Sequence, residues 1–195
     1  MSHGSPTTPT DEELACRAQG GCATSFERLL RRFQTPVLHF LQRRGHAAEA
    51  EDLAQDTFLR AYENLRRYDS RWRFSTWLFT IARRTSLNAR RRKRPAVDPS
   101  AVESAVSSDR SPLDVMAQSE SRRQLWDLAA RLLSEEQWTV LWLHYVEEMP
   151  LREVAKVVNR SRPAVKVSLF RARRKLAAEL DSLNSPFVAC EASYE

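Results

Sequence analysis

Apolar side chains recur every three or four positions along most of the chain, which is the spacing of amphipathic helices. Residues 24–41 show this period most clearly. It returns in 47–65, 71–94, 114–133, 134–148, 150–158 and 162–180. Thr10 with Glu13, Thr24 with Glu27 and Ser134 with Gln137 each have the spacing of a capping box at a helix start. We therefore predict an all-α protein.

Residues 95–112 interrupt this pattern. They contain three Pro and five Ser, and their only large apolar residues are three Val. Such a composition cannot bury a core and is typical of a flexible linker. We predict an N-terminal arm with a short helix at 1–23, a first helical domain at 24–95, a linker at 96–118, a second helical domain at 119–183 and a tail at 184–195.

The net charge of +6 and the pI near 9.6 favour a polyanionic partner. Charge alone leaves nucleic acid, acidic lipid and an acidic protein open. Three Cys without a C-x-x-C pair, and four His at no ligand spacing, predict no zinc site and no other cofactor. The start of the chain lacks the apolar run of a signal peptide, and no apolar run approaches 18 residues. We expect a reduced cytoplasmic protein that is not inserted in a membrane.

Charge is distributed unevenly between two neighbouring segments. Residues 47–65 carry five acids and one base, whereas residues 71–94 carry nine bases and no acid. This contrast indicates two surfaces for two partners, although two solvated faces, paired with each other, would give the same pattern. Within the basic segment Phe74, Trp77, Leu78 and Ile81 share one helical face and are predicted core. Phe79 lies off this stripe and could cover a neighbouring helix. Trp72 precedes the helix, where it could stack on bases.

The second domain contains the pattern of a helix-turn-helix. A helix at 150–158 is followed by a break at Asn159-Arg160, a good N-cap at Ser161 and a longer basic helix. Val165, Leu169, Ala172 and Leu176 mark the buried stripe of that last helix. Arg162, Lys166, Val167, Phe170 and Arg171 then fall towards its outer face. An ordinary amphipathic basic helix remains the alternative.

Three stretches of both domains match one family in the same order. They are "AEDLAQDTFLRAYENL", "RFSTWLFTIARRTSLNARRRKR" and "LSEEQWTVLWLHYVEEMPLREVAKVVNRSRPAVKVSLFRARRKL". The chain resembles bacterial sigma factors of the extracytoplasmic-function type, which keep only sigma domains 2 and 4. The first two stretches look like regions 2.2 to 2.4 of that family, and the third looks like region 4.

This resemblance implies a non-catalytic subunit that binds core RNA polymerase, recognises promoter DNA and assists its opening. An anti-sigma factor is a further implied partner. The implied core-polymerase contacts are Asp52, Gln55 and Asp56. The implied contacts to the −10 promoter element are Arg71, Trp72, Arg73, Arg83, Arg84, Asn88 and Arg91. Those to the −35 element are Arg162, Lys166, Val167, Ser168, Arg171 and Arg174.

The turn before the last helix departs from the family pattern. Asn159-Arg160-Ser161 stands where Gly-Ile-Ser is usual, and Pro163-Ala164 replaces a common Gly-Thr pair. Asn tolerates a left-handed backbone, so we expect the turn to be kept. The departures leave the −35 base preference open.

Two other classes of protein are weaker predictions. A two-domain helix-turn-helix regulator that acts without polymerase would not explain the acidic segment. An enzyme is not supported, because the chain lacks a Gly-rich phosphate loop and the common hydrolase motifs. The acidic pairs Glu135-Glu136 and Glu147-Glu148 are most simply solvated helix ends.

Overall fold

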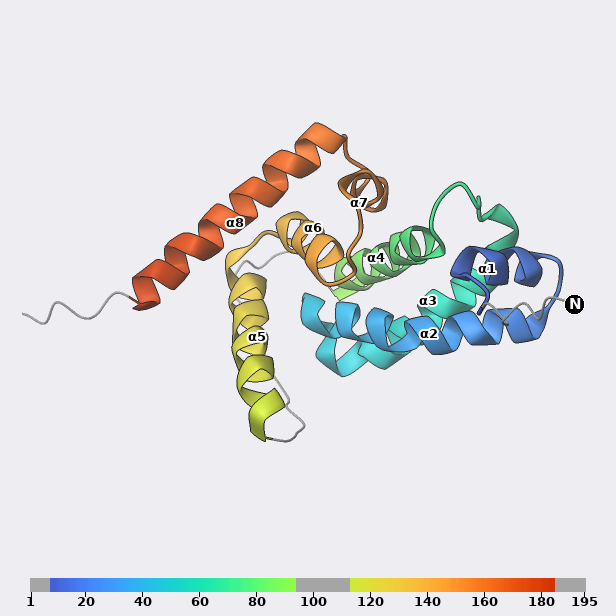
Figure 1. Ribbon diagram of the computed structural model, residues 1–195, viewed down its shortest axis with the longest axis horizontal. Helices are drawn as coiled ribbons and strands as arrows, with labels where there is room; N and C mark the ends of the chain where they lie inside the picture. Colours follow the sequence, from blue (N-terminus) through green and yellow to red (C-terminus); the bar gives the residue numbers. More distant parts are fainter. Residues whose placement is uncertain (1–7, 94–112, 185–195) are drawn as a thin grey trace, which may run out of the picture.

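The computed structural model describes residues 8–93 and 113–184, and every regular element within them is helical (Figure 1). The all-α prediction is thus confirmed for these residues. The predicted linker at 96–118 lies mainly between the two described ranges, although α5 already begins at Leu113. The predicted tail lies almost entirely outside them.

The first domain, taken together with the predicted short helix of the N-terminal arm, contains four α-helices: α1 (Asp11–Gln19), which is that short helix, α2 (Ala23–Leu41), α3 (Ala50–Glu63) and α4 (Phe74–Lys93). A π-helical turn at Gln42–His46 and a short 3-10 turn at Ala47–Glu49 join α2 to α3. Another 3-10 turn at Leu65–Arg67 follows α3. The helices enclose a core that contains Leu14, Leu29, Phe40, Phe74, Leu78 and Phe79, all fully buried.

Local capping explains some helix starts. The capping box of Thr10 and Glu13 at α1 and that of Ser134 and Gln137 at α6 are both formed, which confirms two of the three predicted boxes. The third prediction was wrong. Helix α2 begins at Ala23, with Cys22 as its N-cap, so Thr24 already lies within the helix.

The second domain contains α5 (Leu113–Leu132), α6 (Glu135–Tyr145), α7 (Leu151–Val158) and α8 (Arg162–Asn184). Trp126 of α5 packs against Trp142 of α6 with ring centroids 4.9 Å apart, and Trp142 stacks on Trp138 at 5.1 Å. All three Trp are buried and belong to the core of this domain. Each ring buries a large apolar area, so the cluster is a main source of stability for the domain.

The predicted helix-turn-helix is present in α7 and α8. Asn159 ends α7 in the left-handed conformation with φ of 56° and ψ of 52°, and the Arg160 N–H donates to the Ala155 carbonyl at 3.0 Å. Asn159 therefore adopts the left-handed conformation that a Gly usually provides in this turn, as predicted. Val165, Leu169, Ala172 and Leu176 are all buried, which confirms the predicted stripe of α8.

The face prediction for α4 is confirmed for Phe79, which covers the neighbouring helix α2, and was partly wrong for Trp77 and Ile81. Phe79 is as fully buried as Phe74, and its ring meets Phe40 edge-to-face at 5.3 Å. Trp77 and Ile81, predicted as core, are only half-buried. The reason is that α4 packs against α1, α2, α3 and α7, so neighbours cover it on more than one side.

Candidate nucleic-acid interface and the opposite acidic surface

Helix α3 presents the predicted acidic surface. Asp52 and Gln55 are exposed, whereas Asp56 is half-buried and accepts a hydrogen bond from Arg60 Nε at 2.8 Å. The i,i+4 spacing of this pair was already visible in the sequence. Asp52 and Gln55 are therefore available to a partner, whereas the carboxylate of Asp56 would have to bind Arg60 and the partner at the same time.

An apolar groove of about 690 Å³ runs beside these polar side chains between α2 and α3. Gln55 lies on its wall, together with Leu59 and Tyr62, which are 58% and 57% exposed. Sequence reasoning missed this part of the surface. Leu59 gave the available signal, because it falls off the apolar stripe of its helix and yet is a large apolar residue.

The loop before α4 holds Trp72 in a defined position. The Tyr68 hydroxyl donates to the Trp72 carbonyl at 2.8 Å, and Arg71 binds Asp69 with Nη2 and Oδ2 2.6 Å apart. Hydrogen bonds from Arg71 lower the pKa of the Asp69 carboxyl, so this exposed pair stays ionised at neutral pH. Lys156 of α7 places its Nζ 5.2 Å from the centre of the Trp72 ring.

The predicted −10 contacts in α4 and in the loop before it fall into two groups. Arg84, Asn88 and Arg91 are exposed. Arg83 is half-buried, and this burial lowers the pKa of its guanidinium. Arg73, in the loop, lies against α7, where its Nε is 3.7 Å from the Glu153 carboxylate. The predicted −10 contacts therefore do not form one open surface.

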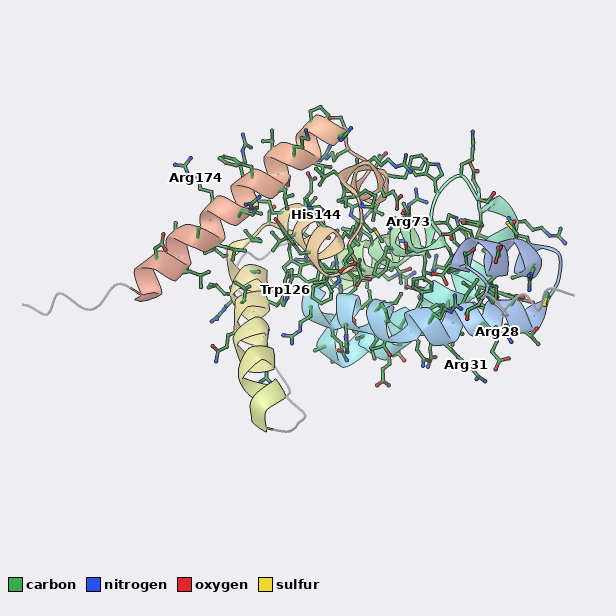
Figure 2. The ribbon with its side chains drawn as sticks, viewed as in Figure 1. Arg28, Arg31, Arg73, Trp126, His144 and Arg174 are labelled. Carbon is green, nitrogen blue, oxygen red and sulfur yellow. The ribbon has the colours of Figure 1, made fainter. Side chains whose placement is uncertain are left out.

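Helix α8 presents a continuous basic surface. Arg162, Lys166, Arg171 and Arg174 are exposed and form no ion pair with any residue in the described ranges, whereas Ser168 is half-buried. Figure 2 shows Arg174 on the side of α8 that faces away from the other helices. Val167 and Phe170 add an exposed apolar patch on the same helix, 47% and 65% exposed. Phe170 was placed on the outer face by its spacing but was not among the predicted contacts.

Polar and charged residues also join the two domains. Arg44 is buried; its Nε donates to Ser86 Oγ at 3.0 Å, and its terminal nitrogens reach Thr139 and the carboxylate of Glu135. Burial lowers the pKa of Arg44 to about 10, and the adjacent Glu135 opposes that shift. The prediction that Glu135 is simply a solvated helix end was therefore wrong.

Comparisons with known proteins agree with this arrangement. Residues 29–96 match the family model for Sigma-70 region 2, and residues 123–176 match that for Sigma-70 region 4. The ECF RNA polymerase sigma factor BldN of Streptomyces coelicolor is 33% identical over 183 residues, which cover 90% of this chain and 69% of that protein. The ECF sigma factor SigW of Bacillus subtilis is 30% identical over 149 residues, 71% of this chain and 79% of that protein.

The chain belongs to the extracytoplasmic-function family of RNA polymerase sigma factors. The resemblance seen in the sequence is thus confirmed, and the reading as a regulator that acts without polymerase is set aside. The solved structure of CnrH in complex with the cytosolic domain of CnrY is similar to this sigma factor. Its TM-score is 0.67 with 26% identity, over 88% of this chain and 97% of that one.

Three further observations concern metals, membranes and thiols. Among the described residues no group of three His, Cys, Asp or Glu side chains could hold a metal ion. None of the described helices is long and apolar enough to cross a membrane. Cys16 and Cys22 are both exposed, and hydrogen bonds with Ser25 and Thr24 lower the pKa of the Cys22 thiol to about 7.

Proposed function

We propose that three separate surfaces of this sigma factor divide the work of transcription initiation in the cytoplasm. The acidic and apolar surface of α3 binds core RNA polymerase. The loop before α4 and the basic face of α4 bind the −10 promoter element. The outer face of α8 binds the −35 element. The supporting observation is that the acidic surface and the basic surfaces belong to different helices, so each can meet its own partner.

The α3 surface suits a protein partner better than DNA. Asp52 and Asp56 would repel phosphates, whereas Leu59, Tyr62 and the groove beside Gln55 supply apolar area that water leaves on binding. A partner with basic residues around an apolar ridge would match both features. The polar contacts set specificity and the groove supplies most of the affinity.

The −10 surface combines stacking with charge. Trp72 stands in a loop whose backbone is bonded by Tyr68 and Asp69, so the position of the residue is fixed before DNA arrives. A base of the opened strand that stacks on this ring would contribute about 1–3 kcal/mol. Arg84 and Arg91 would bind backbone phosphates, and Asn88 can donate to and accept from DNA.

The −35 surface is a recognition helix. Lys166 and Arg171 project from the outer face of α8, where they can donate to base edges in the major groove. Arg162 lies near the start of α8, and Arg174 lies further along it. Both would bind phosphates and so fix the register of the helix on the DNA. Val167 is suited to apolar contact in the major groove. Ser168 is half-buried and would lie at the edge of the surface that contacts DNA.

An anti-sigma factor is the proposed regulator. CnrH, which resembles this chain over most of its length, was solved with the cytosolic domain of CnrY. A partner of that kind would compete for the surfaces that polymerase and DNA use.

Run-off transcription with core polymerase on a promoter library tests the proposal. Asp52→Arg should abolish co-elution with core polymerase and all transcription. Lys166→Ala should keep co-elution but relax the choice of base within the −35 element. Asp181→Arg has the same charge change as Asp52→Arg on an exposed site of α8 and should still co-elute. Normal co-elution of Asp52→Arg would contradict the assignment of α3.

A further inference from the structure

Helix α1 contacts both ends of the loop that contains Trp72, although it belongs to none of the three surfaces proposed above. This loop comprises residues 68–73 and lies between the 3-10 turn at Leu65–Arg67 and the first residue of α4. Figure 1 shows α1 beside the segment that leads from α3 into α4, and α1 packs against both that turn and α4. The contacts of α1 therefore bear on how Trp72 is presented to DNA.

Gln19, the last residue of α1, binds the start of the loop. Its side-chain nitrogen Nε2 donates to the Leu65 carbonyl and to the Tyr68 carbonyl, each at 2.9 Å. Leu65 and Tyr68 are both buried, and carbonyl groups in a buried segment require a hydrogen-bond donor. Because the two carbonyls stand at opposite ends of the 3-10 turn, one amide group fixes the direction in which the chain leaves that turn.

Glu12 binds the other end of the loop. Its carboxylate oxygen Oε1 accepts from the Phe74 N–H at 3.1 Å. Phe74 is the first residue of α4, where N–H groups have no acceptor within the helix. The preceding Arg73 has no acceptor in its side chain and cannot cap the helix itself. A carboxylate is favourable at a helix N-terminus, so Glu12 of α1 takes the place of a local cap for α4.

Helix α1 is itself fixed to the first domain. Leu14 is fully buried, and Asp11 forms an ion pair with Arg32 of α2, with Oδ1 and Nη1 2.5 Å apart. Glu12 and Gln19 are seven positions apart, which is nearly two helical turns, so they lie on the same side of α1. Both ends of the loop are therefore bound by one short element that is anchored to the core.

Tyr68 connects this element with Trp72. Its carbonyl accepts from Gln19, and its hydroxyl donates to the Trp72 carbonyl at 2.8 Å. Its ring packs against Phe74 with centroids 5.7 Å apart. Burial raises the pKa of the Tyr68 hydroxyl, and the nearby charge of Glu12 raises it further, so the hydroxyl stays protonated and continues to donate. The backbone of Trp72 is thus linked to α1 through one buried side chain.

We propose that Glu12 and Gln19 are positioning residues for recognition of the −10 element. They hold the two ends of the loop, so that Trp72 meets the opened DNA strand in one place. This inference rests on the proposed function of Trp72. Neither residue contacts DNA in this role. Each acts through the loop, and α1 thereby contributes to promoter opening without a DNA contact of its own.

Substitutions of Glu12 and Gln19 in the full chain test this proposal. Gln19→Glu keeps the size of the side chain but sets carboxylate oxygens against two carbonyls. Arg17→Gln makes the same change in charge at an exposed site of α1 and is its matched control. Glu12→Ala removes the acceptor of the Phe74 N–H. Glu12→Gln keeps an acceptor at that position and guards against a folding defect.

The first measurement is hydrogen exchange of the free chain, followed by mass spectrometry of peptides that cover residues 66–75. Gln19→Glu and Glu12→Ala should each raise the exchange rate of this segment about five- to tenfold, as expected when one or two hydrogen bonds are lost. Arg17→Gln and Glu12→Gln should exchange as slowly as wild type, and peptides of α8 should be unchanged throughout. Unchanged exchange of residues 66–75 in Gln19→Glu and Glu12→Ala would overturn the proposal.

The second measurement is open-complex formation with core polymerase on a promoter selected by run-off transcription, followed by permanganate reactivity. With Trp72 present, Gln19→Glu should reduce open complexes about fivefold, the lower end of what one stacked base contributes. In a Trp72→Ala chain the same substitution should have no further effect, because it acts through that ring. Arg17→Gln should leave open complexes unchanged in both chains.

Three outcomes of the second measurement would contradict these assignments in different ways. An equal loss with and without Trp72 would mean that Gln19 only supports the fold, and it would overturn the positioning role. Fast exchange of the loop without any loss of open complexes would overturn that role as well. Failure of Trp72→Ala itself to reduce open complexes would instead overturn the proposed function of Trp72, and it would leave the exchange result standing.

Discussion

Helices α4 and α8 are both basic and about equally long, yet their surroundings differ. Helix α4 has 20 residues and packs against α1, α2, α3 and α7. Helix α8 has 23 residues, packs against α5, α6 and α7, and buries a single stripe. Several basic residues in and near α4 already have a partner within the protein, whereas those on the outer face of α8 are exposed to solvent. Two segments of similar charge in the sequence can therefore differ in how many of their basic side chains are free to bind DNA.

The largest effect is expected when one phenylalanine of each helix is replaced. Phe79→Ala on α4 removes a fully buried ring and should lower the free energy of unfolding by about 3–5 kcal/mol. Phe170→Ala on α8 removes a ring that is 65% exposed and should change it by only about 0.5 kcal/mol. Urea unfolding followed by circular dichroism measures both. Equal losses would show that α8 is covered as α4 is.

A smaller effect is expected for the loop before α4. Trp72→Ala should weaken open-complex formation by about 1–3 kcal/mol, because one stacked base loses its support. Permanganate reactivity of promoter thymines in the presence of core polymerase measures this step.

The control for this loop is Trp77→Ala, since Trp77 packs against Tyr68 and Phe74 at 5.5 and 5.7 Å and should chiefly support the fold. Trp77→Ala should lower the melting temperature, and Trp72→Ala should leave it nearly unchanged. If both substitutions had the same two effects, the division between a stacking residue and a scaffold residue would be wrong.

The smallest expected effect is on the salt dependence of DNA binding. Arg174→Ala on α8 should reduce the slope of log affinity against log salt for duplex DNA by about 0.9, because one phosphate contact is lost. Arg90→Ala on α4 should leave that slope unchanged in the absence of polymerase, since Arg90 is paired with Glu135. Fluorescence anisotropy over a range of NaCl concentrations measures both slopes. A larger change for Arg90→Ala would mean that α4 is open in the free chain.

Local physics made much of the fold predictable. The capping box at Ser134, the left-handed Asn159 and the buried stripe from Val165 to Leu176 depend on residues close in sequence. The candidate site was predicted less completely. Leu59, Tyr62 and Phe170 are large apolar residues that are exposed beside the proposed contacts, and none of them was among the predicted contacts. A period in the sequence identifies one apolar face and does not show whether a second face is covered.

The sequence by itself determined the helices, two of the three predicted capping boxes, the helix-turn-helix and the separation of acidic from basic segments, because each depends on spacing within a few turns. Only the tertiary structure decided which charges are open. Arg44 with Glu135, and Thr76 with Glu153, join residues 91 and 77 positions apart. No local pattern specifies such pairs, since they exist only when two domains dock, and it is this docking that covers α4 and leaves the outer face of α8 exposed.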